Sequence, residues 1–165
     1  MADRTTDIRQ PAVAGTFYPA DPQELTHLID GYLEQAPRLD PEPSILIVPH
    51  AGYIFSGHVA ARSFKQAIDR DYTAVIILGF NHSLASSFDG AALWAAGAWR
   101  TPLGDVPIDA DLADRVLKSS SVFKTDRSIH LREHSLEVQV PFIQRALPGI
   151  PIVPISIGRS TLENT

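Results

Sequence analysis

Two short runs of aliphatic residues dominate the hydrophobic pattern of this chain. Residues 45–48 and residues 75–78 each contain only isoleucine, leucine and valine, and each run is followed by turn residues. Runs of this length that end in turns are typical of strands buried on both faces of a sheet. Between the two runs, apolar residues recur at helical spacing after Ser56, which is the expected N-cap of a helix. The pattern therefore predicts a strand-helix-strand unit.

Three further helices are predicted from cap residues and apolar spacing. Asp21 followed by Pro22 marks the start of the first, because aspartate caps helix N-termini and proline is favoured in the first turn. Asp109 marks the start of the second. The third is predicted over residues 136–147, where Pro141 should produce a kink or a break.

Two further segments predict β-structure, and with the helices they indicate an α/β fold. Residues 90–109 suggest a hairpin excursion, and residues 150–158 resemble a strand whose two prolines should limit its pairing. Strands that alternate with helices indicate a three-layer αβα fold with a central sheet that is largely parallel or mixed. We expect residues 1–165 to form a single α/β domain. A doubly wound fold would normally begin another helix after the last strand, so we also expect that a C-terminal part is missing.

Composition narrows the classes of function. The chain has 165 residues, 44% of them hydrophobic and 20% charged, with a net charge of -5. It lacks the clustered lysine and arginine that a nucleic-acid surface needs, and it has no apolar stretch of membrane-spanning length. The N-terminus has no apolar signal core, so we expect a cytoplasmic protein with no nucleic-acid or membrane partner. The chain contains no cysteine, so any metal must be bound through nitrogen and oxygen.

Two histidines follow the two aliphatic runs, and they are the strongest candidates for chemistry. His50 comes after the first run and His82 after the second. A right-handed crossover between parallel strands places both strand ends on the same edge of the sheet, where ligands of open α/β sheets bind. Imidazole is the commonest protein metal ligand. The pair therefore predicts a metal site, although either histidine alone would more often be a turn residue that hydrogen-bonds locally.

A second polar cluster lies at residues 130–137. His134 and Glu137 are three residues apart, a spacing that places them on one face of a helix, and His130 precedes His134 by four residues. Such a set can provide a metal ligand with its supporting carboxylate, or a general acid/base with an orienting partner. The alternative is that Glu137 helps to cap a helix while the histidines are solvated.

Two other side chains near these strand ends are candidates for ligand contact. Tyr53 can donate a phenolic hydrogen bond to a substrate, and Asn81 can hydrogen-bond a ligand. The alternatives are packing for Tyr53 and stabilisation of the turn for Asn81.

Taken together, these motifs resemble the Memo family, whose bacterial and archaeal members are often labelled AmmeMemoRadiSam system protein B. The resemblance covers nearly the whole chain and keeps the family's order of blocks. The blocks are Pro11-Ala12-Val13-Ala14-Gly15-x-Phe17-Tyr18-Pro19, Pro49-His50-Ala51-Gly52-Tyr53-x-x-Ser56-Gly57, Gly79-x-Asn81-His82, Trp99-x-Thr101-Pro102-Leu103-Gly104 and Glu133-His134-Ser135-Leu136-Glu137-Val138-Gln139-x-Pro141-Phe142.

The resemblance implies a fold similar to that of the class III extradiol dioxygenases, which are non-haem iron enzymes. In the family, the positions of His50 and His82 are metal ligands, and the position of His134 lies in a motif that contributes to the same site. The family's third ligand comes from a C-terminal segment that this chain does not contain. Phe80 also departs from the family, because many relatives have proline there.

Two hypotheses of different classes follow. The first is an oxidoreductase in which His50 and His82 hold Fe(II), with copper and zinc as alternatives, while His134, oriented by Glu137, moves protons. The expected substrate contacts are Tyr53, Asn81 and His130. The second is a non-catalytic scaffold that uses the same cleft to hold a peptide, a metal ion or a partner, as has been proposed for family members in signalling. In either case we expect a small-molecule or peptide ligand in the cleft. A third reading, hydrolysis by zinc-bound water, is permitted by the ligand types and favoured by nothing in the sequence. The oligomeric state remains open.

Overall fold

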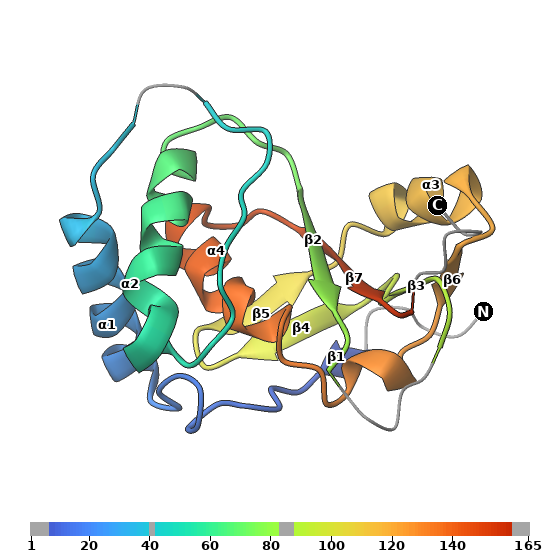
Figure 1. The fold of residues 1–165 in the computed structure, drawn as a ribbon, viewed down its shortest axis with the longest axis horizontal. Coiled ribbons are helices and arrows are strands. Elements are labelled where there is room, and N and C mark those ends of the chain that lie inside the picture. The colour runs from blue at the N-terminus through green and yellow to red at the C-terminus, as the bar shows by residue number, and fades with distance from the viewer. Residues whose placement is uncertain (1–6, 40–41, 83–87, 160–165) are drawn as a thin grey trace.

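The computed structural model describes residues 7–39, 42–82 and 88–159, and it contains two open sheets with helices around them (Figure 1). One sheet has four strands in the order β2-β7-β3-β6, and the other has three in the order β1-β4-β5. The strands are β1 (Ile8–Arg9), β2 (Val75–Phe80), β3 (Ala91–Leu93), β4 (Ala98–Thr101), β5 (Gly104–Pro107), β6 (Phe123–Thr125) and β7 (Ile152–Ile157). The α-helices are α1 (Pro22–Gln35), α2 (Tyr53–Phe64), α3 (Ala110–Ser119) and α4 (Val140–Ala146), and the 3-10 turns are η1 (Lys65–Ala67), η2 (Ser128–His130) and η3 (Glu137–Gln139).

Helices cover the four-stranded sheet from two sides, which confirms the predicted α/β class. Helices α1, α2 and α4 share the main core with Ile77 of β2 and Ile152 of β7. Helix α3 packs on the opposite face, against Val153 and Ile155 of β7. The sheet is mixed, because β7 runs parallel to β2 and antiparallel to β3.

The predicted strand at residues 45–48 is wrong. The segment belongs to neither sheet, and the side chains of Ile45 and Ile47 are 82% and 90% exposed. Leu46 and Val48 face the other way and pack against the main core. The alternation of an extended chain is therefore present, but the segment has no strand partner in the part of the chain that the structure describes. Side chains of the helical layer hold its backbone instead, since the Ser63 hydroxyl donates to the Ile47 carbonyl.

The last strand also differs from the prediction. Its prolines were expected to limit pairing, but β7 is a central strand with a neighbour on each side. Pro154 lies opposite Ile77 of β2, and its carbonyl accepts a hydrogen bond from the backbone of Trp94. A proline lacks only the N–H donor, so its carbonyl can still accept a hydrogen bond within the sheet.

Helix boundaries follow the cap residues in two of three cases. Asp21 and Asp109 cap α1 and α3, as predicted. Ser56 is not the cap of α2, because the helix already begins at Tyr53, whose N–H donates to the carbonyl of Phe17. The helix predicted over residues 136–147 is interrupted, because η3 is a 3-10 turn and α4 begins only at Val140. Pro141 therefore lies in the first turn of α4, where its missing N–H costs nothing.

The hairpin expected within residues 90–109 is formed by β4 and β5. It is joined by β1, a two-residue strand that runs parallel to β4 and that the sequence pattern did not indicate. This pairing brings Arg9 beneath the polar segment 130–137, which matters for the site. In the part of the chain that the structure describes, no helix has the length and apolar character needed to cross a membrane.

Candidate metal centre

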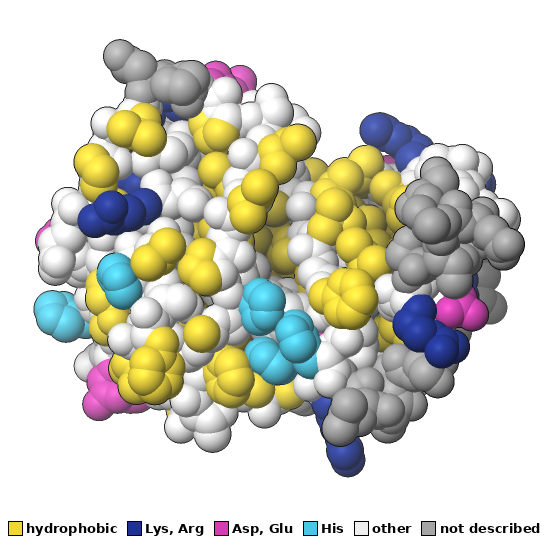
Figure 2. Space-filling model, viewed as in Figure 1, with side chains coloured by type: hydrophobic (Ala, Val, Ile, Leu, Met, Phe, Trp, Pro, Cys, Tyr) yellow, Lys and Arg dark blue, Asp and Glu magenta, His cyan; other side chains and the backbone are white. Residues whose placement is uncertain are grey.

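Three histidines from separate parts of the chain lie together at one end of β2. His50 follows the extended segment 45–49, His82 follows β2, and His134 lies in the turn before η3. The ring centroids are 4.9 Å apart for His50 and His82, 5.1 Å for His82 and His134, and 6.3 Å for His50 and His134. The Nε2 atoms of His50 and His82 are 3.2 Å apart. Histidine side chains gather on the face seen in Figure 2. The expected convergence of His50 and His82 is therefore present, although residues 45–48 form no strand.

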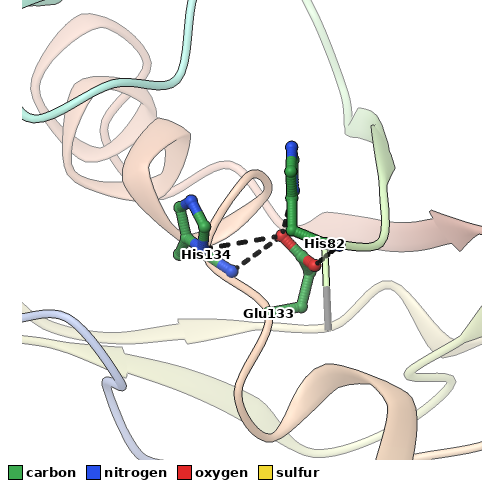
Figure 3. Close-up of side chains that lie close together, drawn as sticks. All are labelled: His82, Glu133 and His134. Atoms are coloured by element: carbon green, nitrogen blue, oxygen red, sulfur yellow. Dashed lines mark hydrogen bonds and ion pairs between the residues drawn. The ribbon is translucent and has the colours of Figure 1, made fainter. Parts of the chain in front are cut away.

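Glu133 is the carboxylate that serves this cluster. Its side chain is buried, and Oε1 lies 3.1 Å from Nδ1 of His82 (Figure 3). The same carboxylate accepts hydrogen bonds from the backbone N–H groups of His82, His134 and Ser135. A carboxylate at Nδ1 accepts a hydrogen bond from the N–H on that nitrogen, and this tautomer leaves the Nε2 lone pair free. Glu133 thus fixes both the tautomer and the orientation of His82.

Electrostatics favour an anionic Glu133 and a neutral His50. Burial opposes ionisation of Glu133, but hydrogen bonds from the backbone N–H groups of Ser135 and His82 outweigh it and hold the pKa of the carboxyl below its usual range. Burial lowers the pKa of His50, and the neighbouring imidazoles of His82 and His134 lower it further. Neutral imidazole is the form that binds metals, so the surroundings of His50 prepare it as a ligand.

The donor geometry fits a transition-metal ion. Metal–nitrogen bonds of about 2.0 to 2.1 Å, at tetrahedral or octahedral angles, place neighbouring ligand nitrogens about 2.8 to 3.4 Å apart. The 3.2 Å between the Nε2 atoms of His50 and His82 lies in that range. An ion bridging these two atoms would require little movement of either ring.

A second donor set consists of His82, Glu133 and His134, whose ligand atoms lie within 4.8 Å of one another. We favour the His50–His82 pair, because the oxygens of Glu133 already accept three backbone N–H groups and one ring nitrogen. Ligation by Glu133 would have to weaken these bonds. The carboxylate therefore fits an orienting role better than a ligating one.

Arg9 holds the loop that carries Glu133 and His134. Its guanidinium donates to the carbonyls of His130 and Glu133 at 2.8 and 2.6 Å, and it pairs with Glu137 at 2.8 Å. Its charged group also lies 4.3 Å from the ring centroid of Trp99. Both members of the Arg9–Glu137 pair are 1% exposed. The segment from His130 to Glu137 is thus anchored by β1 from beneath.

Glu137 does not orient His134, in contrast to the expectation. Its carboxylate accepts hydrogen bonds from the backbone N–H groups of Ala12 and Val13 and from the Tyr18 hydroxyl. The expected spacing assumed one helix through both residues, but η3 begins only at Glu137 and His134 lies in the preceding turn. Glu137 instead anchors the N-terminal segment to the core.

The three expected substrate contacts lie in hydrogen bonds within the protein. The buried Tyr53 hydroxyl donates to the Val138 carbonyl at 2.7 Å. The Asn81 amide donates to the carbonyl of Ile129 at 3.0 Å, and the buried His130 places Nε2 3.0 Å from the carbonyl of Ala92. These polar groups are therefore engaged in hydrogen bonds inside the protein.

Sequence reasoning missed Arg9 and did not single out Glu133. Glu133 lies within the polar cluster at residues 130–137, so attention to every carboxylate beside His134 could have found it. Arg9 is 124 residues from Glu133 and belongs to a strand of two residues, so no local signal marked it.

Comparison with known proteins places these features in a family. A sequence model described as "Memo-like protein" matches residues 9–165. A MEMO1 family protein of Saccharolobus islandicus is 42% identical over 168 residues, which is 94% of this chain and 58% of the relative. MEMO1 family proteins of Thermococcus onnurineus and Methanothermobacter thermautotrophicus are each 39% identical and are matched over 53% and 57% of their lengths.

The chain thus spans a little over half the length of these relatives, while the matched region includes the histidine cluster and Glu133. On both the family model and the identities, this chain belongs to the Memo-like protein family.

Proposed function

We propose that this chain binds a transition-metal ion through Nε2 of His50 and Nε2 of His82, with Glu133 orienting His82. The observation that carries the proposal is the 3.2 Å separation of the two Nε2 atoms, together with the Glu133 carboxylate on the opposite nitrogen of His82. Paired imidazoles with a buried carboxylate behind one of them are the usual construction of a histidine metal site. Fe(II) is the proposed ion, and copper and zinc suit the same ligands.

We propose further that the centre serves an oxidoreductase reaction of a small molecule. Fe(II) held by His50 and His82 would supply the Lewis acidity and the redox chemistry of such a reaction. In this proposal His134, whose ring lies beside His82 and packs against Phe17 at 4.6 Å between centroids, accepts a proton from the substrate. The Glu133 carboxylate accepts a hydrogen bond from the backbone N–H of His134, and this bond fixes the backbone that carries the ring.

A second candidate function is a non-catalytic protein that holds a metal ion or a peptide at the same place. It is favoured by the internal bonding of Tyr53, Asn81 and His130, which leaves the polar atoms expected at a substrate engaged elsewhere. It predicts metal binding without turnover.

The first test is metal binding by the chain under anaerobic conditions, measured by calorimetry with Fe(II) and by metal analysis after gel filtration. We expect one ion per chain. His50→Ala and His82→Ala should each reduce affinity by a factor of 100 or more, while His27→Ala, on the exposed side of α1, serves as the matched control and should leave it unchanged. His134→Ala should lower affinity by less than tenfold. Equal binding by wild type and both ligand variants would refute the assignment.

The second test separates the two candidate functions. Oxygen uptake is measured with the iron-loaded protein and a series of catechols, and His134→Ala is compared with wild type. Uptake that depends on His134 supports the oxidoreductase. Intact iron with no uptake for any catechol favours the non-catalytic alternative.

A further inference from the structure

We propose that Gln139 is a positioning residue of the metal centre, and that it holds His50 in place through the backbone of Pro49. This role rests on the proposed metal site, because a residue that positions His50 matters only if His50 binds the ion. It concerns a buried polar side chain that is neither a candidate ligand nor part of the hydrophobic core.

His50 is held differently from His82. Glu133 lies at Nδ1 of His82 and also accepts its backbone N–H. Among the described residues, the ring of His50 has one hydrogen-bonding contact, which is Nε2 of His82 at 3.2 Å. The extended segment that leads to His50 also has no partner among the described strands. Contacts of the neighbouring backbone are therefore needed to fix the position of His50.

Gln139 supplies such a contact from η3. Its side chain is 5% exposed, and Nε2 lies 3.2 Å from the carbonyl oxygen of Pro49 and 3.3 Å from that of Ser135. An amide nitrogen carries two N–H donors and both partners are carbonyl acceptors, so one NH2 group serves both. Pro49 directly precedes His50. Ser135 directly follows His134. One side chain thus joins the backbones that carry two of the three histidines.

The same turn also holds the end of β2, which leads to His82. The Ser135 hydroxyl donates to the carbonyl of Phe80 at 3.0 Å. Gly79 permits this close approach, because a Cβ at that position would lie 2.7 Å from Oγ of Ser135. Residues 133–139 therefore hold the backbone beside each of the three histidines.

The oxygen of the Gln139 amide indicates that stability is not the reason for this side chain. Oε1 is buried and has no hydrogen-bond partner within the described residues, and such an acceptor lowers the stability of a folded chain. Gln66 is also buried, but both ends of its amide are bonded. Its Nε2 donates to the carbonyls of Pro37 and Arg62, and its Oε1 accepts from the N–H of Leu39. The donor side of Gln139 is therefore the part that serves the site.

The experiment replaces each of these two glutamines by methionine, which is unbranched and has no hydrogen-bond donor. The affinity of the chain for Zn(II) is measured by competition with a chromophoric chelator, and its stability by urea denaturation. Gln139→Met should lower the affinity about five- to tenfold, less than the loss expected when a direct partner of a ligand is removed. Its stability should fall less than that of Gln66→Met, because Oε1 of Gln139 has no bond to lose. Gln66→Met is the matched control and should leave the affinity unchanged.

Double variants show whether Gln139 acts through His50. In a His50→Ala background, Gln139→Met should lower the affinity no further, because the group that it positions is already absent. In a Glu133→Gln background the two losses should multiply, because Glu133 acts on His82. A general structural role of Gln139 would give the same loss in every background, and that result overturns the proposal.

Failure of the metal site and failure of the positioning role give different results. If wild type and His50→Ala bind Zn(II) equally, the site itself is wrong and the role of Gln139 is overturned with it. If the affinity depends on His50 but not on Gln139, the site stands and only the positioning role is overturned.

NMR of the wild-type chain decides the matter if Gln139→Met does not fold. The side-chain NH2 protons of Gln139 should exchange with solvent about tenfold more slowly when Zn(II) is bound, because a bound His50 ring fixes the carbonyl of Pro49. Exchange that is the same with and without Zn(II) would show that the amide and the ligand are not coupled, which also overturns the proposal.

Discussion

The histidine cluster has a closed side and an open side, and the two are built by different means. The closed side is the loop from His130 to Glu137, where buried charges are paired and hydrogen-bonded and where Arg9 reaches up from β1. The open side is β2 with the segment 45–48, where apolar side chains are exposed and one edge of β2 has no partner among the described strands. His82 is fixed from the closed side by Glu133, whereas His50 ends the segment that has no strand partner. Orientation at this site is therefore supplied mainly by buried polar groups.

The largest expected effect comes from removing the anchor of the closed side. Arg9→Met leaves the buried Glu137 carboxylate without its partner, and breaking a buried pair in this way costs about 3 to 5 kcal/mol. We expect the free energy of unfolding, measured by urea denaturation, to fall by that amount.

The control for Arg9 is Arg100→Met, which removes an exposed pair with Asp105. Its effect on unfolding should be far smaller, because exposed pairs are screened by water. Similar losses in the two variants would show that the closed side owes no special stability to its buried charges.

The next effect is a pH dependence of stability from His130. Burial lowers the pKa of this histidine to about 4 from an ordinary value of 6.5. Between pH 6.5 and pH 4, His130 therefore binds a proton in the unfolded chain but not in the folded chain. The contribution of His130 to the free energy of unfolding is fully present above pH 6.5 and is lost as the pH falls toward 4. A shift of this size corresponds to about 3 kcal/mol.

The measurement is chemical denaturation of wild type and His130→Asn from pH 7 to pH 4. We expect the difference in unfolding free energy between the two proteins to shrink as the pH falls, by up to about 3 kcal/mol. A constant difference across this range would mean that His130 gains a proton in the folded state as readily as in the unfolded state.

A smaller effect on metal affinity is expected from the carboxylate that orients His82. Glu133→Gln keeps the size of the side chain but removes its charge, and loss of such a supporting group lowers metal affinity about 10- to 100-fold. Competition with a chromophoric chelator measures this change. Glu42→Gln, at an exposed position, is the matched control. An unchanged affinity in Glu133→Gln would mean that the closed side does not orient the ligand.

The contrast between the two sides also explains what the sequence could predict. Asp21, Asp109 and the apolar spacing behind them are local signals, and the helices they predicted are present. The convergence of His50 and His82 was predicted from strand order, and it is present although residues 45–48 form no strand. The runs 45–48 and 75–78 carry the same local pattern, yet only the second is paired, because pairing depends on a partner that the pattern does not specify.

Long-range polar contacts are the part of the candidate site that the sequence could not predict. Whether Glu133 or Glu137 orients a histidine depends on where η3 begins. Sequence spacing does not fix that boundary to within two or three residues. Arg9 reaches a segment more than 120 residues away, and nothing in its neighbours marks that contact. Local sequence patterns therefore could not predict the buried polar network, whereas they did indicate the positions of the histidines.

The smallest expected effect tests the open side directly. The Ser63 hydroxyl donates to the Ile47 carbonyl at 3.2 Å and is a tether between α2 and the segment that leads to His50. Ser63→Ala should cost only about 0.5 kcal/mol, because this bond is exposed to water. Hydrogen exchange of residues 45–48 should nevertheless become faster, and metal affinity should fall about two- to threefold, because His50 would be less well fixed. Ser119→Ala, which removes an exposed hydroxyl bond at the end of α3, is the control and should leave both quantities unchanged. If Ser63→Ala lowered metal affinity as much as Glu133→Gln, the open side would orient the site as strongly as the closed side does.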